Sequence, residues 1–286
     1  MSQLVIGQLL NGAIVGTLYA ILALAVTLTF GITGIVNFAL GAFMMMGGYL
    51  TWYAHDSLQM PYAIAVVAAV VAVGVVGLVT DLCLFRFTRN NLVNGLLVSI
   101  GLISIIEAGV LIVWTATPKD LAYVLPGVIE AAGISAPKIK LVVFALLLLV
   151  ILGTYLALTR TWTGRAAFAY AQNSEAAALM GVNTAVLESA VMVYSAMLAG
   201  LGGALYASLY SLEPTLGSAF ILKAVEAAIM AGIGNAIGAL AGGVILGITE
   251  GVGSIYLPIA FRDAYGLVFL VAILLVKPNG LFGGKS

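Results

Sequence analysis

Three carboxylates inside long apolar stretches are the clearest candidates for chemistry in this sequence: Glu107, Glu226 and Glu250. An acidic side chain at the centre of a lipid-spanning helix costs about 2.5 to 3.5 kcal/mol on insertion scales, so it needs a compensating role. Lys223 precedes Glu226 by three residues, a helical spacing that predicts an ion pair. Glu107 and Glu250 have no cation at such spacing, so a bond to a hydroxyl, protonation and a place in a proton path all stay open.

Enzymatic and metal chemistry find no support in the residue pattern. The only histidine, His55, lies beside Asp56 in what reads as a short outer loop, and no nucleophile, base and orienting group occur at recognisable spacing. The single Cys83 excludes an internal disulfide, and no Cys or His pair has metal-ligand spacing. We therefore expect no enzyme, no metal and no cofactor in this chain.

The composition places most of the chain in a lipid bilayer. Of its 286 residues 63% are hydrophobic and 8% charged, and 11 Lys and Arg balance 11 Asp and Glu. Soluble domains carry about a quarter charged residues, so this chain cannot cover a water-facing surface. Zero net charge without a basic block argues against a nucleic-acid partner. Since no linker or low-complexity tract divides the chain, we predict a single transmembrane domain over residues 1–286.

Apolar runs predict an all-α integral membrane protein, a polytopic bundle of about eight to nine transmembrane helices. The runs cover residues 4–30, 39–54, 62–85, 92–115, 140–159, 188–210, 219–233, 236–255 and 263–276. Those at 39 and 263 fall below the roughly 20 residues of a full span, so they are expected to be half-helices or tilted pieces. Lys and Arg are almost evenly divided between the two faces, which slightly favours an outside N-terminus and a cytoplasmic C-terminus.

Two segments that contain Gly and Asn, residues 30–41 and 232–238, interrupt the apolar sequence. Such breaks are tolerated in a membrane where they line a cavity or are covered by protein, and they often mark solute sites in transporters. The first can equally be a tight turn at the cytoplasmic surface. Comparable breaks in opposite halves suggest an inverted repeat of spans one to four and six to nine. The candidate solute-path residues are Asn37, Phe38, Gly41, Glu226 and Asn235.

A long polar interruption at residues 160–187 predicts a short surface helix. Asn173 or Ser174 can cap its start, Glu175 suits its positive end, and Gly181 can end it in a left-handed conformation. A loop that only connects two spans needs a few residues, so the helix has another use. It either contacts a partner or the bundle, or lies on lipid as an interfacial helix.

Three blocks resemble the permease subunits of branched-chain amino acid ABC importers of the high-affinity leucine, isoleucine and valine type. They are residues 8–24, residues 31–49 with the core Ile35–Ala39, and residues 165–183, and the likeness runs from about residue 3 to 283. The third block resembles the cytoplasmic loop by which such permeases grip their ATPases. The resemblance therefore implies an ATPase-coupling role for Arg165, Asn173, Glu175, Ala176, Ala177, Leu179, Gly181, Val182 and Asn183. Ala42 and Phe43 depart from the family, which often has a charged residue after Gly41.

The resemblance implies a transport subunit that moves branched-chain or related amino acids across the bacterial inner membrane, while separate subunits hydrolyse ATP. The expected partners are a second homologous permease subunit in a heterodimer, two ATP-binding cassette ATPases, a periplasmic or lipoprotein solute-binding protein, and membrane lipid. No residue separates this prediction from a urea or amide ABC permease. A different class of protein also remains open, a proton-coupled secondary carrier that uses Glu107 or Glu250.

Overall fold

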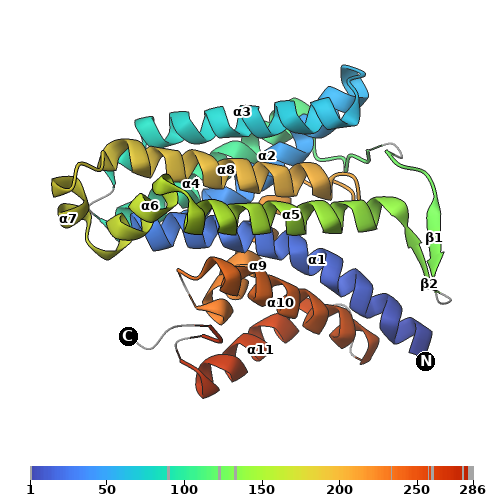
Figure 1. Ribbon diagram of the computed structural model, residues 1–286. Helices are drawn as coiled ribbons and strands as arrows, with labels where there is room; N and C mark the ends of the chain where they lie inside the picture. Colours follow the sequence, from blue (N-terminus) through green and yellow to red (C-terminus); the bar gives the residue numbers. More distant parts are fainter. Residues whose placement is uncertain are drawn as a thin grey trace.

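The computed structural model describes residues 2–88, 91–121, 124–131, 134–232, 234–256, 258, 261–278 and 280–282. Over these residues the chain is a bundle of long helices that run roughly along one direction (Figure 1). The long helices are α1 (Ser2–Leu28), α3 (Tyr62–Cys83), α4 (Leu92–Trp114), α5 (Lys138–Arg160), α8 (Thr184–Tyr206) and α10 (Ala236–Tyr256). In the described part of the chain, six helices are long and apolar enough to cross a membrane. The prediction of a polytopic helical membrane protein is thus confirmed.

Three helices are shorter than a full span: α2 (Ala39–Trp52), α9 (Leu216–Ala231) and α11 (Arg262–Val276). Most of α2 and α9 is buried, and the two helices pack against each other inside the protein. Their contact is close because Gly41 faces Gly217, where an added Cβ would overlap the Gly217 carbonyl oxygen. They are therefore half-helices covered by the surrounding long helices, a placement that lets irregular backbone exist at membrane depth.

Helix α1 is the centre of the bundle, and residues 18–25 are fully or almost fully buried. Its main partner is α10, and the crossing is built on glycines. A Cβ added to Gly12 would lie 2.6 Å from the Gly247 carbonyl oxygen, and one added to Gly16 would lie 2.8 Å from that of Gly243. Small residues at four-residue spacing let two backbones touch in a solvent where no hydrophobic effect drives helices together.

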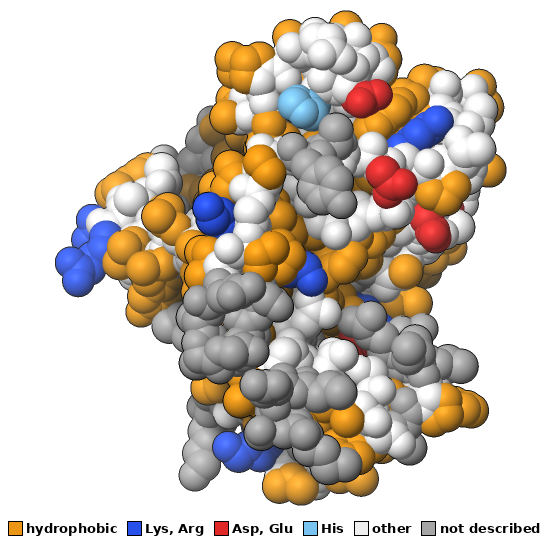
Figure 2. All heavy atoms as spheres, turned by 90° about the vertical axis from the view of Figure 1, so that its right-hand side faces the viewer, with side chains coloured by type: hydrophobic (Ala, Val, Ile, Leu, Met, Phe, Trp, Pro, Cys, Tyr) orange, Lys and Arg blue, Asp and Glu red, His pale blue; other side chains and the backbone are white. Residues whose placement is uncertain are grey.

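The two ends of the bundle carry different connecting elements (Figure 1). One end has the start of α1 and an antiparallel hairpin of β1 (Val128–Ala131) and β2 (Ile134–Pro137). Side chains of both charge signs are scattered over this end (Figure 2). The opposite end has α6 (Trp162–Gln172) and α7 (Ser174–Leu179), which join α5 to α8. The hairpin lies in a loop for which the sequence predicted no strand.

Candidate functional site

The connection between α5 and α6 is a tight reversal built on Thr161 and Gly164. The Thr161 Oγ1 accepts a hydrogen bond from the Gly164 N–H at 3.1 Å, which caps the first turn of α6. Gly164 lies directly on the backbone of Leu158, so no side chain fits there. Ala166 and Ala167 are then buried against the bundle. Helix α6 is therefore fixed to the end of α5, although the sequence did not predict it as a separate helix.

Helix α7 has the caps that the sequence predicted. The Asn173 side-chain oxygen accepts a hydrogen bond from the Ala176 N–H at 2.9 Å. Glu175 stands in the first turn, where the helix dipole favours a negative charge. Gly181 has φ +87°, the left-handed conformation expected after the last turn. Asn183 repeats the capping pattern for α8, where its side chain accepts from the Val186 N–H at 3.2 Å.

The nine predicted coupling residues divide into an exposed and an inward-facing set. Ala177 is buried and Val182 is half-buried, so these two hold α7 against its neighbours. Leu179 lies at the tip with 89% of its surface exposed, and so does its neighbour Met180, which is not among the nine, with 86% exposed. The other exposed members are Arg165, Asn173, Glu175, Ala176, Gly181 and Asn183. Two bulky apolar side chains thus project from a rigid polar element at one end of the bundle.

The two breaks predicted from the sequence meet in space. The first is a π-helical turn, Thr29–Thr33, that ends at Gly34 with φ +71°, and the second contains Gly234 with φ +93°. A Cβ added to Gly31 would lie 3.1 Å from the Gly234 Cα, so the two backbones are nearly in contact. Both glycines border a cavity of about 140 Å³ whose opposite wall is α6. The first break therefore lines a cavity, one of the two arrangements expected for it.

The polar residues of the breaks stabilise helix starts. The Asn37 Oδ1 accepts from the Ala39 N–H at 3.0 Å, and its amide donates to the Met192 Sδ at 3.2 Å. The Asn235 Oδ1 accepts from the Gly238 N–H at 3.0 Å, and its amide donates to the Phe282 carbonyl oxygen at 3.1 Å. Phe38 is half-buried. The structure does not bring these side chains together with Glu226, and their role in a solute path stays a prediction.

A buried charge cluster joins α1, α9 and α10. The Lys223 Nζ lies 2.8 Å from Glu250 Oε1 and 3.6 Å from Glu226 Oε2, and the Tyr19 hydroxyl donates to Glu250 Oε2 at 2.9 Å. Glu250 is fully buried. The predicted Lys223–Glu226 pair is confirmed. The stronger Lys223–Glu250 pair was missed, because it joins two helices and leaves no local spacing in the sequence.

Glu107 is the third membrane carboxylate and lies apart from this cluster. It is half-buried on α4, and its Oε1 atom is buried without a hydrogen-bond partner among the residues that the structure describes. In the same described part of the chain, no group of three or more His, Cys, Asp or Glu side chains is arranged to hold a metal ion.

Comparison with known proteins finds similar sequences over nearly the whole chain. Residues 8–277 match the family described as branched-chain amino acid transport system / permease component. The high-affinity branched-chain amino acid transport system permease protein BraD of Pseudomonas aeruginosa is 28% identical over 96% of this chain and 95% of its own. The corresponding permease protein LivH of Escherichia coli is 29% identical, over 96% and 94%.

An archaeal relative shows the same extent of similarity. The probable branched-chain amino acid transport permease protein LivH of Methanocaldococcus jannaschii is 29% identical over 96% of this chain and 92% of its own. No solved structure matches the chain. Because the family match covers far more than half of the sequence, this chain belongs to the permease component family of branched-chain amino acid transport systems.

Proposed function

We propose that this chain is the membrane-spanning subunit of an ATP-binding cassette importer that moves branched-chain or related amino acids across the bacterial inner membrane. Its relatives BraD and LivH, which are named as permease proteins of high-affinity branched-chain amino acid transport systems, support this substrate class. Residues 1–286 then form one permease domain, and residues 160–187 form the coupling loop within it. Two separate ATPase subunits hydrolyse ATP, and a periplasmic or lipoprotein solute-binding protein delivers the solute.

The observation that carries the proposal is the rigid α6–α7 unit with its exposed apolar tip. Fully burying one leucine or methionine side chain stabilises an interface by about 1.5 to 3 kcal/mol, so Leu179 and Met180 suit a groove in a partner protein. Arg86, Arg160 and Arg165 lie on elements at the same end of the bundle. Since basic residues concentrate on the cytoplasmic side, this end faces the ATPases and α1 begins outside.

The cavity beneath α6 lies between the coupling loop and the two breaks, so a movement of the loop can be transmitted to the membrane interior there. Phe168 and Ala171 on α6 share its wall with Gly31 and Gly234. A displacement of α6 by the ATPases therefore acts directly on both breaks. Because a partner shifts a conformational equilibrium only by its differential affinity, the ATP-bound ATPases must fit one position of α6 better than the other.

The packing pattern supports the inverted repeat. Helix α1 packs mainly on α10, and α8 packs on α3 in the corresponding manner, while the half-helices α2 and α9 contact each other between them. In this arrangement α1–α4 and α8–α11 are the two repeat units, inserted in opposite directions. If α2, α9 and α11 are counted with the six long helices, the proposed bundle has nine membrane segments.

We place the solute path along the half-helices α2 and α9, where the two repeat units meet. Phe38 and Asn235 are partly accessible and can contact the solute, whereas Asn37 and Gly41 shape the backbone around it. Glu226 is held beside Lys223 and would act on the path only by charge. A second, homologous permease subunit completes the path in a heterodimer, and apolar faces on α3, α4, α5 and α11 are exposed for lipid or for that subunit.

The test is ATP-dependent uptake of radiolabelled leucine in cells or vesicles that contain the complete transporter. Leu179→Glu combined with Met180→Glu should abolish uptake and ATPase co-purification while the chain still inserts into the membrane. Leu58→Glu, a matched change at an exposed leucine outside the coupling loop, should preserve both. Uptake that continues without ATP under a proton gradient, with no ATPase bound, would instead identify a secondary carrier. Faster uptake of urea or a short amide than of leucine would reassign the substrate within the same class.

A further inference from the structure

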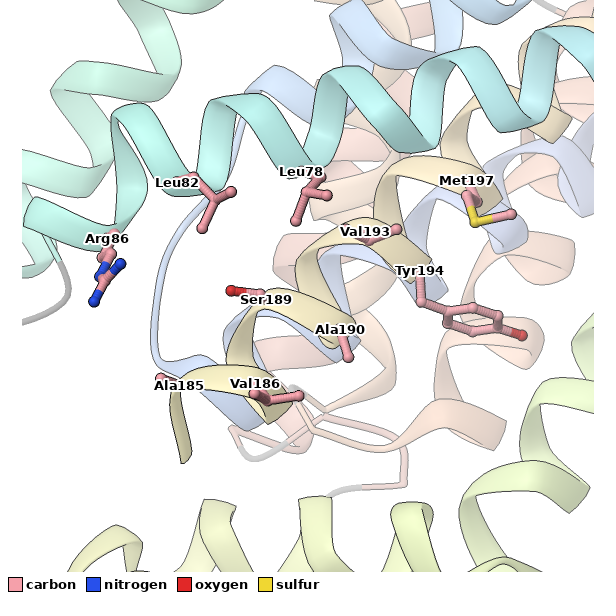
Figure 3. Close-up of a pocket in the computed structure, with 10 residues that line it drawn as sticks. All are labelled: Leu78, Leu82, Arg86, Ala185, Val186, Ser189, Ala190, Val193, Tyr194 and Met197. Carbon is pink, nitrogen blue, oxygen red and sulfur yellow. The ribbon is translucent and has the colours of Figure 1, made fainter. Parts of the chain in front are cut away.

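A groove of about 630 Å³ runs between α3 and α8 on the outside of the bundle. Leu78 and Leu82 reach from α3 toward α8, where Val193 faces them, and Arg86 stands at the end where α8 begins (Figure 3). Both helices belong to the candidate membrane spans. The groove walls are therefore apolar along the membrane and positively charged at one end.

The position of Arg86 is fixed by the turn that follows α3. Arg86 is the middle residue of a short 3₁₀ turn, Phe85–Phe87, and Phe85 is fully buried in the core. The Thr88 N–H donates to the Phe85 carbonyl oxygen at 2.9 Å and closes this turn. The guanidinium is exposed and forms no ion pair with any residue that the structure describes. It is thus an available cation, held at the rim of an apolar groove.

We propose that this groove is a binding site for an anionic glycerophospholipid, with an acyl chain along Leu78, Leu82 and Val193 and the phosphate at Arg86. Basic sites between transmembrane helices bind lipid head groups because each Lys or Arg near the membrane surface contributes attraction for anionic lipid. The guanidinium also offers forked N–H donors that match phosphate oxygens. The proposal needs only that the chain spans a membrane, and it is independent of the transported solute.

Lateral access to the groove agrees with a lipid occupant. Val71, Val75 and Val79 leave about half of their surfaces exposed along α3, so the groove is continuous with a lipid-facing helix surface. Ser189 lines the groove and donates a hydrogen bond to the buried Asp81 at 2.5 Å. The solute proposed above enters between the half-helices, on another part of the bundle.

The experiment is native mass spectrometry of the full chain, purified with the subunits that accompany it and titrated with phosphatidylglycerol or phosphatidylcholine of equal acyl chains. We expect phosphatidylglycerol to bind about tenfold more tightly to the unmodified protein. Arg86→Gln should remove this preference. The matched control Arg160→Gln, at an exposed arginine of the same end that does not line the groove, should keep it. Ala190→Phe, which narrows the groove, should weaken the binding of both lipids.

Equal binding of the two lipids by the unmodified protein would overturn the proposal, and so would an equal loss of preference in Arg86→Gln and Arg160→Gln. A photo-crosslinker at Val186 should capture lipid; exclusive capture of a protein subunit would show that another chain covers the groove instead. Unchanged melting temperatures in lipid-free detergent show that the variants are folded, so a change in lipid preference then reports on the site itself.

Discussion

Lys223, the cation of the buried charge cluster that joins α1, α9 and α10, is the residue for which the structure gives the most specific prediction about stability. Lys223→Met removes the ammonium group 2.8 Å from Glu250 and leaves that fully buried carboxylate without its cation. Removing one partner of a buried ion pair typically destabilises a protein by about 3 to 5 kcal/mol, because the remaining charge stays in a medium of low dielectric constant. Methionine matches the apolar stem of lysine in length, so little of this cost comes from packing.

The second half of the prediction separates charge from packing. Adding Glu250→Gln to Lys223→Met should restore most of the lost stability, since the neutral amide oxygen can still accept the Tyr19 hydroxyl bond. Replacing a whole buried ion pair by neutral groups is often neutral in stability. Lys138→Met, at an exposed lysine, is the matched control and should change the free energy of unfolding by less than about 0.5 kcal/mol.

The assay is a double-mutant cycle on unfolding free energies, obtained by titrating the purified chain from mild detergent into sodium dodecyl sulfate. The prediction requires a large loss of unfolding free energy in Lys223→Met. It also requires the cycle to give a coupling energy between the two substitutions of comparable size and opposite sign. If Lys223→Met is as stable as the unmodified chain, or if the double variant is less stable than Lys223→Met, the assignment of Lys223 and Glu250 as a stabilising buried ion pair is refuted.

Three further predictions address packing, capping and hydrogen bonding. Gly203→Ala places a Cβ on the Met44 carbonyl oxygen and should destabilise the chain by about 1 to 3 kcal/mol, whereas Gly153→Ala, with no atom within 4 Å, should not lower the melting temperature. Asn173→Ala removes the cap of α7 at a cost of about 1 kcal/mol, visible as faster amide hydrogen exchange in α7 and not in α8. Tyr19→Phe removes the hydroxyl bond to Glu250 and should cost about 1.5 to 3 kcal/mol of unfolding free energy, against no loss if the bond is absent.

Local signals in the sequence were sufficient for much of the fold. Apolar runs of about 20 residues predicted the long helices, since the bilayer leaves the backbone no alternative to internal hydrogen bonding. Asn173, Glu175 and Gly181 predicted the capping of α7 because each acts on backbone groups within four residues of itself. The Lys223–Glu226 pair followed from i, i+3 spacing for the same reason.

Features that depend on two distant segments could not be derived in this way. The Lys223–Glu250 pair and the approach of Gly31 to Gly234 exist only because α1, α9 and α10 are packed together. Helix α6 was missed because its polar residues and small alanines read as part of a surface loop, although the contact of Gly164 with Leu158 fixes it against α5. Such a contact leaves no periodic pattern in the sequence from which it could be predicted.

The two breaks meet at Gly31 and Gly234, and the close approach of their backbones requires glycine rather than a residue with a polar side chain. Gly31 and Gly234 approach through backbone atoms, and a side chain at Gly31 would separate the two segments. The cavity between them and α6 leaves space on one side of this contact, so the backbone can shift without displacing a packed core. In the coupling mechanism proposed above, a movement of α6 would therefore reach both breaks at one point, and the glycine-packed α1–α10 pair would serve as the fixed frame.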